Sequence, residues 1–164
     1  MREPARILVT NTTPLIALTA ATGSLDVLRF LYQRVVVPME VADEVRVGGK
    51  QSFGLNVFEK ANWLDIQEAN VALQPFLQNS LDRGEAAVIQ TAMNLGVPLV
   101  CIDEAVGRRV ARLCELDVTG SVGVLLKARR LGYAVSMAEA LQRMRLQGIW
   151  LSDKVAQFAL AQDN

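Results

Sequence analysis

The chain contains no histidine among its 164 residues. Histidine is the side chain that titrates closest to neutral pH, the usual general base of serine hydrolases and a frequent zinc ligand. Its absence excludes a Ser-His-Asp triad and a histidine-ligated zinc centre. Any chemistry in this chain has to use carboxylates, amides, hydroxyls or a bound metal ion.

Cysteine, net charge and long apolar runs are also scarce. Cys101 and Cys114 have no metal-binding or redox spacing, and we expect free thiols in a reducing cytosol. The formal net charge is zero, so nucleic-acid binding would require a local basic patch. No apolar run reaches the roughly 18 residues of a membrane span, and we expect no signal peptide ahead of the first strand. These features predict a cytoplasmic protein with no membrane segment.

Short apolar runs alternate with helical patterns along the whole chain, which is 51% hydrophobic and only 5% aromatic. Strands are expected at 7–9, 35–37, 63–66, 98–102 and 117–119. Helices are expected after the first strand and at 25–31, 39–47, 55–60, from 82 to Gly96, 104–115, 121–131, 136–147 and 152–162. Residues 48–52 read as a loop, and 68–81 as a loop with an irregular helical turn. This alternation predicts one α/β domain, residues 1–164, with a parallel sheet covered on both faces and with residues 136–164 as C-terminal helices packed on it.

A polar residue follows the first strand directly, at the start of a helix. Residues 7–9 suit a strand buried on both faces, and Thr12 or Thr13 can be the N-cap of a helix with Pro14 near its first position. Asn11 therefore lies at the carboxyl end of a strand. In open α/β sheets, ligands bind at that edge.

Three carboxylates have a comparable setting. Asp103 ends an aliphatic strand, Glu85 lies on the inward stripe of its helix, and Glu44 lies near the apolar face of 39–47. Carboxylates at a core edge are costly unless they are neutralised, and oxygen-only ligands suit Mg²⁺ or Mn²⁺. Such ions activate water and stabilise charge on a phosphoryl group. Each residue alone also has a structural explanation: a cap for Asp103 or Asn11, a favourable helix dipole for Glu85, and a solvated helix surface for Glu44.

Several segments together resemble the PIN domain family. Residues 7–18 resemble its opening, although the family usually has Asp where this chain has Asn11. Matching segments follow in order over nearly the whole chain, at 36–45, 81–89, 99–111, 119–126 and 151–153. The last two are similar to an uncharacterised prokaryotic PIN subfamily.

The resemblance implies a three-layer α/β/α fold with a parallel five-stranded sheet and the first strand at its centre. It also implies RNA cleavage that depends on carboxylate-held Mg²⁺ or Mn²⁺, often by the toxin of a type II toxin–antitoxin pair, which would make RNA and an antitoxin protein the partners. Glu44, Glu85 and Asp103 match the family's acidic positions, and Thr13 matches the hydroxyl beside the first acid, where it would orient a bound water. Asn11 departs from the pattern.

Asn11 keeps a carbonyl oxygen for a metal but loses a negative charge. At 4 Å and an effective dielectric of 20, one unit charge contributes roughly 4 kcal/mol, and roughly twice that toward a divalent ion, as an upper bound. Weak metal binding and slow or absent hydrolysis are therefore expected. A degenerate natural enzyme, a deliberately inactivated form of a toxic nuclease, and a working site with a shifted metal demand all fit this departure.

A basic stripe follows Asp103. Residues 105–130 contain Arg108, Arg109, Arg112, Lys127, Arg129 and Arg130 against Glu115 and Asp117. The stripe could follow a phosphate backbone, with Arg108, Arg109 and Arg112 as substrate contacts, or it could simply solvate two helix faces. Of these arginines, Arg108 is the strongest candidate for a substrate contact, because it belongs to the motif that follows Asp103. The scarcity of aromatic residues predicts little sequence readout.

Two functions other than RNA cleavage are also compatible with the sequence. A non-catalytic PIN fold that binds RNA or protein is favoured by Asn11. A small α/β phosphohydrolase or nucleotide binder would need a glycine-rich phosphate loop, which the chain lacks. The late helices also carry much apolar surface, which predicts homodimerisation or antitoxin docking; its residues are Leu141, Met144, Ile149, Trp150 and Phe158.

Overall fold

The computed structural model describes residues 6–48 and 54–163. Within them, five parallel strands form one sheet in the order β3-β2-β1-β4-β5. The strands are β1 (Ile7–Thr10), β2 (Arg34–Val37), β3 (Asp65–Ile66), β4 (Leu99–Cys101) and β5 (Asp117–Thr119). The predicted all-parallel sheet with the first strand at its centre is confirmed.

Strand β1 is central because it is apolar on both faces and pairs on both edges. Val9 pairs with Val36 of β2 and Val100 of β4, and all three side chains are fully buried. A strand in this position needs apolar residues without alternation, as the sequence of residues 7–9 has. The polar residues begin where β1 ends, so the carboxyl edge of the sheet is where β1 can carry chemistry.

The helices fill the connections between the strands. They are α1 (Thr12–Thr22), α2 (Asp26–Leu31), α3 (Met39–Val47), α4 (Leu55–Lys60), α5 (Pro75–Ser80), α6 (Arg83–Leu95), α7 (Ala105–Leu113), α8 (Ser121–Arg130), α9 (Met137–Leu146) and α10 (Asp153–Ala161). Local chemistry sets several of these ends. Asp82 caps α6 by accepting from the Glu85 backbone N–H at 2.8 Å, and Gly96 ends α6 with a positive φ of 68°.

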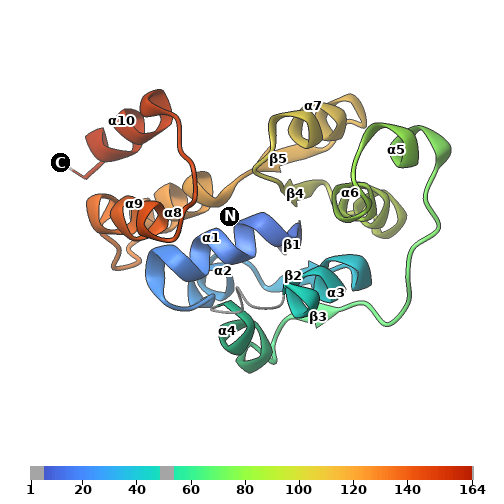
Figure 1. Cartoon of the computed structure of the whole chain (residues 1–164), viewed down its shortest axis with the longest axis horizontal. Helices are drawn as coiled ribbons and strands as arrows, with labels where there is room; N and C mark the ends of the chain where they lie inside the picture. The colour runs from blue at the N-terminus through green and yellow to red at the C-terminus, as the bar shows by residue number, and fades with distance from the viewer. Residues whose placement is uncertain (1–5, 49–53, 164) are drawn as a thin grey trace, which may run out of the picture.

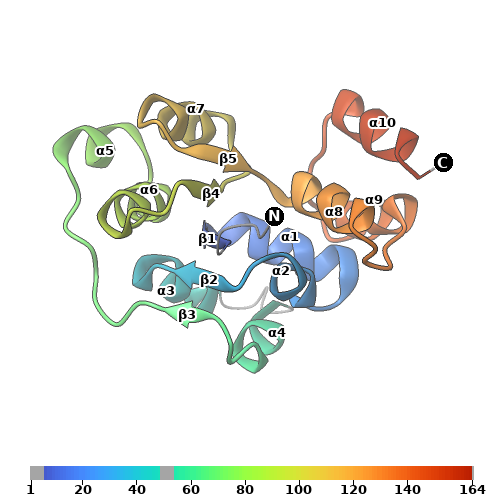
Figure 2. The same cartoon turned by 180° about the vertical axis from the view of Figure 1, so that it is seen from behind.

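The helices lie in two layers with the strands between them (Figure 1). Helices α1, α2, α8 and α9 gather on one side of the strands, and α3, α5 and α6 gather on the other. The opposite view shows the same division (Figure 2). Helix α6 packs on β1 and β4, whereas α1 packs on α8 and α9. This is the expected three-layer α/β/α arrangement.

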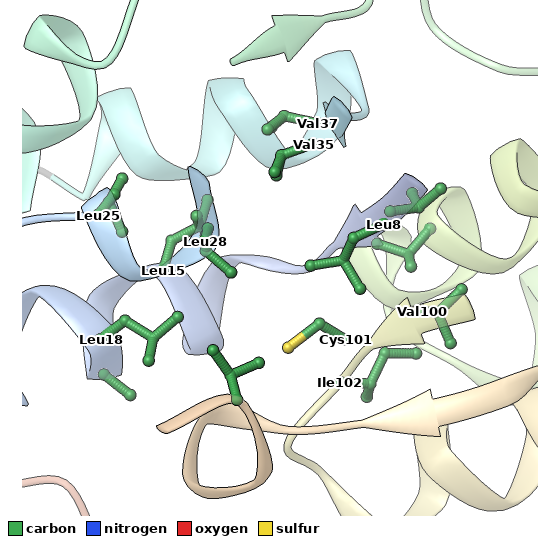
Figure 3. Packing of buried hydrophobic residues seen from close by; sticks show 14 of the residues in the cluster. Leu8, Leu15, Leu18, Leu25, Leu28, Val35, Val37, Val100, Cys101 and Ile102 are labelled. Carbon is green, nitrogen blue, oxygen red and sulfur yellow. The ribbon is translucent and has the colours of Figure 1, made fainter. Parts of the chain in front are cut away.

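One apolar cluster joins the sheet to these helices. Leu8 of β1 and Cys101 of β4 are completely buried, and Leu15 and Leu18 of α1 belong to the same cluster (Figure 3). Leu141 and Met144 of α9 are buried as well. The apolar surface predicted for the late helices is thus partly used inside the fold.

The segment 68–81, expected to be a loop with an irregular helical turn, is more ordered than its sequence suggested. It contains helix α5, and its approach is held by two side chains: Glu40 accepts from the Val71 backbone N–H at 2.8 Å, and Gln90 accepts from that of Gln74 at 3.0 Å. Both partners are far away in sequence, so periodicity could not reveal them. Strand β3 is also shorter than the expected 63–66, and residues 49–52 of the expected loop lie outside the described residues.

Among the described residues, no helix combines the length and the apolar character that crossing a membrane requires.

Candidate active site

Asn11 lies at the end of β1 and is the N-cap residue of α1. Its backbone N–H donates to the Cys101 carbonyl at 3.0 Å, which ties the ends of β1 and β4 together. Its side chain is only 3% exposed, and its Oδ1 has no hydrogen-bond partner within the described part of the chain. A buried carbonyl oxygen without a hydrogen-bond partner destabilises the fold, so the orientation of the Asn11 side chain needs an explanation.

The expectation that Thr12 or Thr13 is the N-cap is wrong. Both residues lie inside the first turn of α1, and their hydroxyls donate to carboxylates from other elements. Thr12 donates to Glu44 of α3, and Thr13 donates to Glu104 Oε2 at 3.0 Å. An acidic side chain therefore approaches the N-terminus of α1 from each side, where the helix dipole favours negative charge.

Because residue 84 is a glycine, it leaves room for oxygen atoms of three side chains. A methyl group there would lie 3.1 Å from Glu44 Oε1, 3.3 Å from Asn11 Oδ1 and 3.7 Å from Asp82 Oδ1. The predicted residues Asn11 and Glu44 therefore face the same small space at the start of α6. Asp82, which the sequence identified only as part of a helix start, joins them.

Glu85 is the most perturbed acid of the site. Its side chain is 6% exposed, and its Oε2 has no hydrogen-bond partner among the residues that the structure describes. It packs so closely against α7 that a methyl group at Gly107 would lie 2.6 Å from Oε2. Burial first, and then the charges of Asp82 and Glu104, raise the pKa of Glu85 to about 7. A bound cation would relieve this repulsion.

Asp103 faces a different element. Its Oδ1 accepts from the Ser121 backbone N–H at 2.8 Å, at the start of α8. Burial raises the pKa of Asp103, while the bond from Ser121 and the nearby Arg108 guanidinium oppose that rise. Arg108 Nη1 also donates to the Ile102 carbonyl at 2.8 Å. Asp103 thus makes the cap-like contact that its strand-end position allowed.

Glu104 is the site residue that the sequence analysis missed. It accepts from Thr13, and its charge acts on Glu85, so it belongs to the acids around Asn11. The available signal was the adjacent pair Asp103-Glu104 at the end of a buried strand. The direction of the backbone after β4 decides which of the two neighbouring acids faces Thr13 at the start of α1. Composition and periodicity do not reveal that direction.

The arginines predicted as substrate contacts differ in their surroundings. Arg108 is half-buried beside Asp103, whereas Arg109 and Arg112 are exposed on α7. Farther along the stripe, Arg129 donates to the carbonyls of Gln162 and Asp163. The stripe is therefore divided between a surface near the site and contacts that hold the C-terminal end.

The donor set fits a hard divalent cation by its chemistry. Two buried oxygens, Asn11 Oδ1 and Glu85 Oε2, lack partners, and the neighbouring acids supply only further oxygens. Within residues 6–48 and 54–163, no three His, Cys, Asp or Glu side chains are gathered closely enough to form a ready-made metal site.

These features define a class of protein: a parallel α/β domain with an oxygen-rich acidic site beside its central strand. A family model for the PIN domain matches residues 7–164, and the chain belongs to the PIN domain family. PIN domains are generally nucleases that depend on divalent metal ions. No curated protein gives a significant match to the chain.

Proposed function

We propose that this PIN domain is a ribonuclease dependent on Mg²⁺ or Mn²⁺, with activity lowered by Asn11. The observation that carries the proposal is the pair of buried oxygens without partners, Asn11 Oδ1 and Glu85 Oε2, among further acids at the same sheet edge. A buried oxygen without a hydrogen-bond partner costs free energy, which a bound cation would recover. Family membership supports hydrolysis of a phosphodiester as the reaction.

Asn11, Glu44 and Glu85 would hold the cation, with an acid from the end of β4. When bound, the ion supplies Lewis acidity toward a phosphoryl oxygen and lowers the pKa of a coordinated water. The Thr13 hydroxyl donates a hydrogen bond to Glu104 Oε2 and so ties that carboxylate to the start of α1. Asp103, held by Ser121 and neighboured by Arg108, keeps the α8 side of the edge in place.

A cleavage assay with Mn²⁺ and single-stranded RNA tests the proposal. We expect slow cleavage by the wild type and faster cleavage by Asn11→Asp, by about tenfold or more, because the restored charge strengthens ion binding and 1.4 kcal/mol corresponds to tenfold in rate. Glu85→Gln is the matched inactive control. If Asn11→Asp stays inert under conditions where the chain binds RNA, the nuclease proposal fails.

A non-catalytic module that binds RNA or protein is the second candidate. It is favoured by the neutral Asn11 and by the lack of a ready-made cluster of three acids within the described residues. A Mn²⁺ titration monitored by electron paramagnetic resonance distinguishes the two candidates, because a non-catalytic binding module would not bind Mn²⁺ at Glu85.

The partners follow from the proposed activity. RNA is the proposed substrate, a protein antitoxin is the proposed inhibitor if the chain acts as the toxin of a toxin–antitoxin pair, and the cytoplasm is the proposed location. Homodimerisation is also proposed, through exposed apolar side chains of the last helix such as Leu160. A monomeric elution profile of the isolated chain would contradict the dimer.

A further inference from the structure

A groove of about 970 Å³ opens beside the acidic site. At one end it is lined by Thr13, Asp103 and Glu104, and it extends to the segment before α10 and to α10 itself. Helix α10 lies next to α8 and α9, across from α7 (Figure 1). A molecule held in this groove would therefore reach the carboxylates of the proposed nuclease site.

Two large aromatic side chains line the far part of the groove. Trp150 is 83% exposed and Phe158 is 61% exposed, more than any other aromatic residue in the described part of the chain. Exposed apolar surface costs roughly 25 cal/mol per Å² compared with burial. In a chain with only 5% aromatic residues, two such rings beside one groove indicate a surface that is covered when a ligand is bound.

We propose that Trp150 and Phe158 stack on unpaired bases of a single-stranded RNA whose backbone reaches the carboxylates at Asn11. This inference rests on the proposed ribonuclease function and adds a base-binding subsite to it. Every base has a π-face, so an aromatic ring can hold any of them without reading sequence. A duplex keeps its bases stacked inside, so the subsite would select unpaired RNA.

The charges around the groove are divided between two acids at its reaction end and arginines on α7. Its acidic lining residues are Asp103 and Glu104, at the reaction end, and Arg108 lines it beside them. Arg109 and Arg112 are exposed on the same helix as Arg108, where they can meet phosphates. The other wall, with Ile149 and Val155 beside the aromatic rings, is apolar and suits bases rather than phosphates.

Fluorescence of Trp150 gives a direct test, because the chain has only two tryptophans. In a Trp63→Phe background, Trp150 alone reports binding. A short single-stranded oligouridylate, added in EDTA to prevent cleavage, is expected to quench this fluorescence, whereas an RNA duplex is not. In the wild-type background, Trp150→Ala and Phe158→Ala are each expected to weaken binding by about 5- to 150-fold, the fold-change that matches 1–3 kcal/mol per stacked base.

Leu146→Ala is the matched control, since Leu146 is 77% exposed on α9 and does not line the groove. It should leave RNA affinity unchanged, and circular dichroism should show all variants folded. Equal affinity of Trp150→Ala and wild type for the single strand would overturn the inference, as would equal quenching by duplex RNA. A change of oligomeric state in Trp150→Ala without loss of RNA affinity would also overturn it and would assign the rings to self-association.

The test separates this inference from the proposed hydrolysis. If the wild type binds the single strand with quenching of Trp150 but never cleaves it, the base subsite stands and the nuclease activity fails. If the wild type cleaves RNA while Trp150→Ala binds and cleaves it equally well, the activity stands and the subsite fails.

Discussion

Asn11 places a neutral amide at the point where acidic side chains from three other elements approach. Its Oδ1 faces the space at Gly84 together with Glu44, while Glu85 and Glu104 interact nearby. An aspartate here would add a charge to a group in which burial, and then the charges of Asp82 and Glu104, already raise the pKa of Glu85. The amide therefore reduces repulsion in the metal-free protein and also reduces attraction for a cation.

Glu104 and Asp103 are expected to separate into different roles. Glu104→Gln should weaken Mn²⁺ binding and lower the pKa of Glu85, because the charge of Glu104 acts on Glu85. Asp103→Ala should instead cost about 1 kcal/mol of stability, because it removes the cap-like bond from the Ser121 N–H. Manganese binding by electron paramagnetic resonance, a carboxyl NMR titration and urea unfolding measure the three effects. An unchanged Mn²⁺ affinity in Glu104→Gln would remove Glu104 from the site.

Glu85 should make stability depend on pH near neutrality. Its folded pKa of about 7 lies above the usual 4.5 of a glutamate, so between these values the folded state binds more protons than the unfolded state. Stability should therefore fall as pH rises from about 4.5 to about 7, by at most about 3 kcal/mol and less where solvent screens the charge. Urea unfolding across this range in EDTA should show the slope, and Glu85→Gln should flatten it. A wild-type slope equal to that of Glu85→Gln would contradict the raised pKa.

At the scale of elements, the close approach of α6 and α7 positions the site. A methyl group at Gly107 would lie 2.6 Å from Glu85 Oε2 and 2.9 Å from Ile102 Cγ2. Gly107→Ala should therefore force α7 away from Glu85 and destabilise the fold by about 1–3 kcal/mol. Arg109→Ala, an exposed change on the same helix, should stay within about 0.5 kcal/mol. Urea unfolding compares them, and equal stability of the two variants would show that α7 is not held by this contact.

Elements with strong local patterns could be predicted from sequence. Strand β2 follows from a β-branched run, and helix α6 follows from an apolar stripe that opens at Asp82 and ends at Gly96, all local signals. Helix α5 and the N-cap of α1 could not be predicted, because they depend on partners distant in sequence. The hydroxyls of Thr12 and Thr13, for example, go to Glu44 and Glu104 rather than to their own helix.

The site could be predicted only in part for the same reason. Asn11, Glu44 and Glu85 stand out because polarity interrupts an apolar pattern. Asn11 and Glu44 lie beside Gly84 at the start of α6, whereas the Glu85 carboxylate packs against Gly107 of α7. That these residues together hold a metal ion stays a prediction. Whether Asp103 acts in catalysis stays a prediction. Glu104 and the groove below α10 could not be found from spacing, because they depend on how the chain turns after β4 and where the last helix packs.

At the scale of the whole molecule, the C-terminal end fixes one wall of the groove. Asp163 accepts from the backbone N–H groups of Met137 at 2.9 Å and Ala138 at 3.0 Å, at the start of α9. Arg129 of α8 donates to the Asp163 carbonyl at 2.7 Å and pairs with the Asp163 carboxylate at 3.2 Å. Because α10 contributes Val155 and Phe158 to the groove, these contacts connect its shape to the end of the chain.

Neutralising Asp163 should therefore loosen α10 and weaken RNA binding without unfolding the sheet. The two backbone donors, and then Arg129, lower the pKa of Asp163 below its usual 3.8, so its stabilising effect is complete above that value and is lost as pH falls through the lower folded pKa. Asp163→Asn should reproduce this loss at neutral pH. Hydrogen exchange of α10 amides should become faster while that of β1 stays unchanged, and affinity for single-stranded RNA should fall. Asp153→Asn, an exposed change on α10 itself, is the control. Unchanged exchange in α10 would show that packing against α9, rather than Asp163, holds this wall of the groove.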